Sequence, residues 1–167
     1  MLIRNEEEKD WAAIHIVNAS AFKSPAEAYL VDTLRKEACP IVSLVAVEDN
    51  TVVGHIMFSP VLLTHHPELK IMGLAPVAIL PDNQGRGIGS ALVRMGLERC
   101  KDLGVGAVVV LGHPEYYPRF GFLPCSRFGI GCEYDVAEEA FMVVELQSGY
   151  LRGNSGTIKY HAAFNNV

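Results

Sequence analysis

Apolar residues recur along this chain first with the spacing of helices and then in the short runs typical of buried strands. Trp11, Ile14 and Val17 lie three residues apart, which predicts an amphipathic helix. Ser24-Pro25 predicts the start of a second helix, since serine is a favoured N-cap and proline a favoured first helical residue. The first third of the chain is thus predicted to hold a strand at 2–4, helices at 8–22 and 24–39, and strands at 41–47 and 51–59 joined as a hairpin.

The second half of the chain contains a strand–helix–strand pattern. An apolar run at 73–80 leads through a glycine-rich turn into a helix that Gly104 ends, and a second apolar run follows at 107–111. Such a unit predicts two parallel strands joined by a helical crossover. The remaining pattern predicts loops at 60–70 and 123–140 and late strands at 141–146 and 157–160. The order of elements favours a three-layer α/β or α+β domain with a mixed sheet.

Length, composition and charge then limit the classes of function. We expect the 167 residues to form a single domain, 1–167, that buries its own core. The net charge of −5 argues against a general nucleic-acid binder, which needs a basic face. No apolar run approaches the roughly 20 residues of a membrane helix, and the early acidic residues are unlike a secretory signal, so a cytoplasmic location is expected. The four cysteines form no C-x-x-C pair, so no metal site is expected.

The residues with the clearest chemistry lie between the strand at 73–80 and the helix that follows it. There the chain reads Gln84-Gly85-Arg86-Gly87-Ile88-Gly89-Ser90. The first N–H groups of a helix lack intrahelical partners and glycine lets a ligand approach the main chain, so this turn is a candidate phosphate site. Arg86 is either a phosphate ligand or a solvated surface arginine.

The spacing of the turn excludes the common nucleotide motifs. A P-loop needs Gly-Lys-Ser/Thr at the helix start, and that sequence is absent. A Rossmann turn needs glycine at its first, third and sixth positions, but counting from Gly85 the sixth position is Ser90.

The turn instead resembles the acetyl-CoA pyrophosphate loop of the GCN5-related N-acetyltransferase (GNAT) family, which reads Gln-x-x-Gly-x-Gly. The segments 77–81 and 117–122 resemble that family's central strand and its Tyr-x-x-x-Gly-Phe motif, and the segments 111–117 and 153–160 are similar to the YhbS-type acetyltransferases. The resemblance implies a mixed, mostly antiparallel central sheet flanked by helices, in which the parallel strands around Val77 and Val109 splay apart.

The resemblance also implies a function, the direct transfer of an acetyl group from acetyl-CoA to a primary amine. The acceptor would be a small-molecule amine or a protein or peptide amine, and a homodimer is compatible with the sequence. A catalytically silent CoA-binding sensor is the alternative. The implied acetyl-CoA-binding residues are Val77, Ala78, Ile79, Gln84, Gly85, Arg86, Gly87, Ile88, Gly89 and Ser90.

By the same resemblance Tyr117 is the candidate general acid for the leaving thiolate, with its neighbour Tyr116 as the alternative. Tyrosine titrates near roughly 10 and a thiol near roughly 8.5, so the phenol remains protonated and can donate. Pro118 is expected to push Tyr117 away from helical geometry.

Glu27 and His113 are candidate bases for the incoming amine, together with His55 and Glu115. Glu27 also fits the capping-box position set by Ser24, which is the favoured interpretation. His113 is equally well explained as a loop histidine, and His55 is predicted to be a satisfied core residue.

Overall fold

The computed structural model describes all 167 residues and divides them into two compact units, each built from separate stretches of the chain. Unit 1 comprises residues 1–59, 75–99 and 162–167, and unit 2 comprises 60–74 and 100–161. The strand order is β1-β2-β3-β4-β5-β8-β6, with β7 and β9 pairing outside this path. The pairing is mostly antiparallel, as in the mixed sheet that the sequence predicts.

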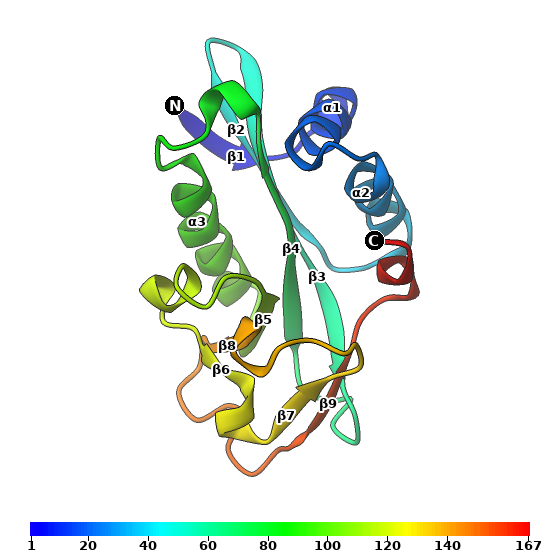
Figure 1. The fold of residues 1–167 in the computed structure, drawn as a ribbon, viewed down its shortest axis with the longest axis vertical. Coiled ribbons are helices and arrows are strands. Elements are labelled where there is room, and N and C mark those ends of the chain that lie inside the picture. Colours follow the sequence, from blue (N-terminus) through cyan, green and yellow to red (C-terminus); the bar gives the residue numbers. More distant parts are fainter. The chain divides into compact units, whose positions relative to one another are not determined.

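Unit 1 places two helices on one side of its strands and a third helix on the other (Figure 1). Even-numbered residues of β3 face α3, since a Cβ on Gly54 would meet Leu92, and Phe58 packs against Gly96. Odd-numbered residues face α1, where Asn18 bonds to His55. Both faces of β3 are therefore covered. The elements are β1 (Leu2–Asn5), α1 (Trp11–Phe22), α2 (Ala26–Glu37), β2 (Val42–Glu48), most of β3 (Thr51–Leu63), the end of β4 (Ile71–Ile79) and most of α3 (Ile88–Asp102).

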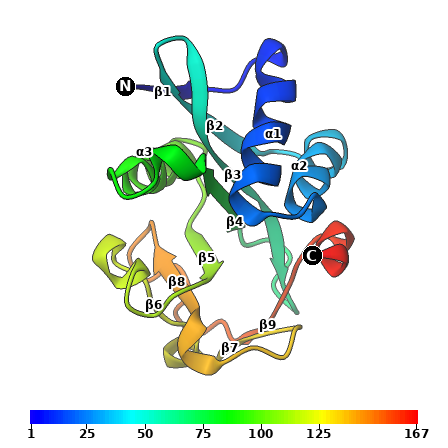
Figure 2. The ribbon, with the colours of Figure 1, turned by 45° about the horizontal axis from the view of Figure 1, so that its top comes forward.

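Unit 2 is built around the short, apolar strand β5 (Ala107–Leu111). It pairs in parallel with the first residues of β4 and antiparallel with β8 (Phe141–Glu145). Valines on β5 and β8 face a core that also contains Leu63 and Ile158. Figure 2 shows β7 (Ile130–Cys132) beside β9 (Gly156–Lys159), with which it pairs in parallel, and the remaining strand is β6 (Leu123–Pro124).

Most predicted elements are confirmed, with boundaries shifted by a few residues. The predicted loop at 60–70 is partly wrong, because β3 continues to Leu63, where its last residues pair with β9. The predicted loop at 123–140 contains β6 and β7. Strands of two or three residues are too short to show an alternating pattern, and only their partners reveal them. None of the helices combines the length and the apolar character needed to cross a membrane.

Candidate active site

The glycine-rich turn in unit 1 is open on its outer side. Gln84 Nε2 donates to the carbonyl of Ile79 at 3.1 Å, which ties the turn to the end of β4. Gly85 and Gly87 have φ values of 76° and 82°, the left-handed region that glycine tolerates best. A Cβ built at either position would have no atom within 4 Å. The backbone of the turn is therefore accessible to a ligand.

The start of α3 adds hydrogen-bond donors to this turn. The first intrahelical bond runs from the N–H of Ala91 to the carbonyl of Gly87 at 3.1 Å. The N–H groups of Ile88 and Gly89 come before this first bonded N–H and have no acceptor within the helix. The dipole of a 15-residue helix places partial positive charge at the same end. These features fit a phosphate group.

Arg86 is engaged in an ion pair. Its two terminal nitrogens lie 3.2 and 3.1 Å from the carboxylate oxygens of Glu48, and its side chain is half-exposed. The guanidinium thus holds the turn against the β2–β3 hairpin. An incoming phosphate would meet the main chain first, and Arg86 only by exchanging its partner.

Val77, Ala78 and Ile79 lie beyond the parallel pairing of β4. The register joins Gly73 to Val109 and Leu74 to Val110, and β5 ends one residue later. Continued in that register, Val77 would lie opposite residue 113, past the end of β5. The strand edge at 77–79 therefore has no partner in β5, which is the arrangement expected of splayed strands.

If the turn holds the pyrophosphate of CoA, as the resemblance of the sequence implies, Gly87→Ala is expected to weaken CoA binding about tenfold, or about 1.4 kcal/mol. The Cβ adds strain in the left-handed region and occupies the open side of the turn. Titration calorimetry with CoA measures the effect. Gly131→Ala is the matched control, because its Cβ also meets no atom within 4 Å, and it should change nothing. Equal CoA affinity in the wild type and Gly87→Ala would show that the turn does not hold the CoA pyrophosphate.

Tyr117 in unit 2 is a buried aromatic residue, with 7% of its surface exposed. Its ring centroid lies 5.1 Å from that of Tyr116 and 5.6 Å from that of Phe122. Burial, and to a lesser degree Tyr116, raise the pKa of Tyr117 to about 12. The expected departure from helical geometry is wrong. Tyr117 opens a 3₁₀ turn that ends at Phe120, because proline is tolerated early in a helix, where no N–H is required.

Gly112 sets the position of the Tyr117 ring, because a Cβ there would overlap Cε2 of that ring. Gly112→Ala is therefore expected to cost roughly 1–3 kcal/mol of stability, the usual range for overpacking. Urea unfolding measures the loss. In a Tyr117→Ala background the same substitution should cost little. An equal cost in both backgrounds would show that the ring is not the cause.

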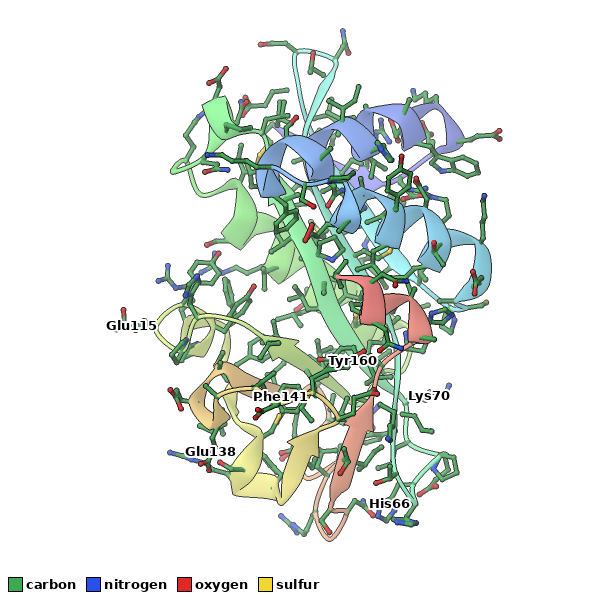
Figure 3. All side chains as sticks on the ribbon, turned by 45° about the vertical axis from the view of Figure 1, so that its right-hand side comes forward. His66, Lys70, Glu115, Glu138, Phe141 and Tyr160 are labelled. Carbon is green, nitrogen blue, oxygen red and sulfur yellow. The ribbon has the colours of Figure 1, made fainter.

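His113 is exposed on the loop after β5, and its backbone carbonyl accepts the N–H groups of Tyr116 at 3.1 Å and Tyr117 at 3.4 Å. The structure thus brings His113 and Tyr117 together through the main chain. Glu115 lies at the outer edge of the same loop (Figure 3).

Glu27 lies in the first turn of α2, in unit 1, and the capping-box interpretation of this residue is wrong. Ser24 Oγ accepts the N–H of Ala26 at 3.2 Å, but α2 shows no capping box. Glu27 falls instead on the inward stripe of Val31 and Leu34, both fully buried. Its Oε2 is buried and accepts no hydrogen bond.

A buried polar chain behind α1 and α2 is the feature that the sequence did not reveal. Asn18 Nδ2 contacts His55 Nδ1 at 3.1 Å, and His55 Nε2 contacts Ser43 Oγ at 2.8 Å. Ser43 donates to Glu6, which Arg35 holds through Nε at 2.6 Å and a terminal nitrogen at 3.0 Å. Burial lowers the pKa of His55 to about 3, Glu6 opposes that shift, and Arg35 adds to it. His55 is thus a neutral core histidine, as predicted.

A comparison with known protein families identifies the family of this chain. The model described as "Acetyltransferase (GNAT) domain" matches residues 2–125. The chain belongs to the GNAT acetyltransferase family. It is 37% identical over 166 residues to the uncharacterised N-acetyltransferase YhbS of Escherichia coli K12, covering 99% of each chain. It is also 38% identical over 137 residues to YjhQ of the same organism, covering 80% of this chain and 76% of YjhQ.

Solved structures of GNAT proteins agree with this assignment. The crystal structure of YhbS from E. coli in complex with CoA has a TM-score of 0.92 and 36% identity, covering 98% of this chain and 91% of that one. A GNAT acetyltransferase from Brucella melitensis in complex with acetyl-CoA has a TM-score of 0.81 and 37% identity, covering 98% and 97%. The GNAT fold predicted from the sequence is confirmed, and the protein is an N-acetyltransferase.

Proposed function

We propose that this N-acetyltransferase moves the acetyl group of acetyl-CoA to a primary amine by direct attack. The observation that carries the proposal is the open glycine turn at the N-terminus of α3, whose backbone donors fit a pyrophosphate. Two similar GNAT structures contain CoA and acetyl-CoA, which supports the same donor here.

Acetyl-CoA, the acetyl donor, would lie along two parts of unit 1. The turn from Gln84 to Ser90 would hold the pyrophosphate, mainly through main-chain N–H groups. The free edge at Val77, Ala78 and Ile79 would pair with the amides of the pantetheine arm, since buried main-chain groups need partners. An N–H of that edge would also polarise the thioester carbonyl.

In the transfer itself, the amine nitrogen attacks the thioester carbon, and a C–N bond forms. The tetrahedral intermediate then breaks its C–S bond, the CoA sulfur leaves as a thiolate, and the amine gives up one proton. Tyr117 would donate a hydrogen bond or its proton to that sulfur. A pKa of about 12 keeps the Tyr117 phenol protonated throughout the neutral range. A thiol is a stronger acid than this phenol, so Tyr117 is favoured to donate a hydrogen bond to the thiolate and not to transfer its proton completely.

The amine has to reach the thioester as a free base, since a lysine-like amine titrates near roughly 10.4. Glu27 and His113 are the proposed proton acceptors, directly or through water. The acceptor is a small-molecule amine or an amine of a protein or peptide. The net charge of −5 favours cationic acceptors through long-range attraction.

A screen of thiol release from acetyl-CoA, with amines, amino acids and peptides as acceptors, tests the function. Steady release that depends on one amine class, with the acetylated amine detected by mass spectrometry, is the expected result. Tight CoA binding without turnover on any acceptor would favour the sensor function instead.

A further inference from the structure

Glu48 lies at the end of β2, where the hairpin turns back into β3. The two residues that follow it, Asp49 and Asn50, have φ values of 49° and 61°, the left-handed conformations that tight hairpin turns require. Glu48 is the last residue of β2 that pairs with β3, and it alternates along the strand with Ala46, whose partner Gly54 faces α3. The Glu48 side chain therefore lies on the side of the sheet that carries α3.

The main chain also joins this hairpin to the segment that leads into the glycine-rich turn. The register of β2 and β3 shifts after Ala46, which leaves Val53 of β3 as an extra residue in a bulge. The carbonyl of Val53 accepts the N–H of Leu80, directly after β4, at 2.9 Å. The hairpin and the start of α3 thus lie side by side in unit 1 (Figure 1).

Arg86 is the one charged residue between positions 84 and 90. Each of its two terminal nitrogens contacts a different carboxylate oxygen of Glu48, at 3.2 and 3.1 Å. A guanidinium binds two oxygens of a phosphate through the same kind of two-point contact. The carboxylate of Glu48 and a phosphate would therefore compete for this edge of Arg86.

The exchange of one partner for the other would cost little. The side chains of Arg86 and Glu48 are 53% and 22% exposed, and exposed ion pairs contribute little to stability. Arg86 lies between Gly85 and Gly87, whose main chain is open to a ligand. A phosphate bound by that main chain would lie in the same turn as the guanidinium.

We propose that Glu48 controls CoA affinity by competing with a phosphate of CoA for Arg86. Glu48 holds the guanidinium before CoA binds, the phosphate takes it over in the complex, and Glu48 recovers it when CoA leaves. The proposal rests on the proposed function, in which CoA is also the product of the transfer. Product release limits the rate of many enzymes, and a competing carboxylate would speed that step.

Titration of CoA at low ionic strength into the wild type, Glu48→Gln, Arg86→Gln and the double variant tests the exchange. Glu48→Gln should bind CoA about threefold more tightly, because no ion pair has to be broken first. Arg86→Gln should bind CoA about tenfold more weakly, since a charge-assisted bond to the phosphate is lost. In the Arg86→Gln background, Glu48→Gln should change nothing, because the two residues act on CoA only through each other.

Asp49→Asn is the matched control for charge alone. Asp49 is the next residue of the hairpin and is exposed, and asparagine also tolerates its left-handed conformation. The control should leave CoA affinity nearly unchanged. Dephospho-CoA, which keeps the pyrophosphate and lacks the 3′-phosphate, identifies the group that Arg86 binds. A gain from Glu48→Gln that persists with this ligand assigns the pyrophosphate, and a gain that disappears assigns the 3′-phosphate.

Two further measurements separate competition from a structural role. Displacement of CoA followed by stopped flow should be slower in Glu48→Gln, and the urea midpoints of both single variants should match that of the wild type. Three results would overturn the proposal and leave the function standing: a gain no larger than that of Asp49→Asn, the same gain in both backgrounds, or weaker CoA binding by Glu48→Gln. A wild type that does not bind CoA would overturn the proposed function itself.

Discussion

Tyr117→Phe is expected to lower kcat about 100-fold, the lower end of the usual contribution of a positioned acid. The variant keeps the ring, which packs against Phe122 and over Gly112, and removes only the hydroxyl. KM for acetyl-CoA should therefore stay within about twofold, because an interaction made mainly in the transition state changes kcat and not ground-state binding. Steady-state thiol release with both substrates varied measures the two constants.

Tyr116→Phe is the matched control, since the two tyrosines are neighbours and their rings meet edge to face. Tyr116 is half-buried, and Arg119 stacks on its ring at 4.4 Å. The control should retain most of the wild-type kcat. Full activity in Tyr117→Phe, together with a large loss in Tyr116→Phe, would move the acid role to Tyr116. Full activity in both variants would remove tyrosine from the mechanism.

The glycine-rich turn could be predicted from the sequence because its determinants are local. A strand, a turn with glycines at set spacing and a helix start occupy one continuous stretch, and the φ values of Gly85 and Gly87 follow from that stretch. The partner of Arg86 could not be predicted, because Glu48 is 38 residues away in the chain. Sequence spacing alone does not show which distant residues a fold brings together.

Glu27 shows the opposite case, in which a local pattern is present but the expected structure does not form. Ser24-Pro25-Ala26-Glu27 has the composition of a capping box, yet α2 begins at Ala26 with Pro25 as its N-cap, and Glu27 Oε2 is buried without a hydrogen bond. His55 could be recognised as a core residue from its strand. Its partners come from α1, β2 and the segment after β1, and no pattern along the sequence joins them.

The buried polar chain makes the stability of the folded protein depend on pH. His55 determines whether stability rises or falls as the pH is lowered. An unfolded chain takes up a proton at this histidine below about pH 6.5, whereas the folded protein does so only near pH 3. Between these values the unfolded state binds one more proton, so stability falls as the pH falls. The loss should be about 2 kcal/mol from pH 7 to pH 5. Arg4 lowers the pKa of the Asp10 carboxyl, so that group begins to contribute only at more acid pH.

Urea unfolding at pH 7, 6 and 5 measures this dependence, and His55→Gln isolates its source. Glutamine cannot titrate and retains an N–H donor for Ser43, so its free energy of unfolding should be lower at pH 7 but nearly flat down to pH 5. His113→Gln, on the exposed loop, should keep the wild-type slope. Parallel pH profiles for the wild type and His55→Gln would mean that His55 is not held neutral. A protonated ring carries an N–H on both nitrogens, so Nδ1 of His55 could then no longer accept from the amide nitrogen of Asn18.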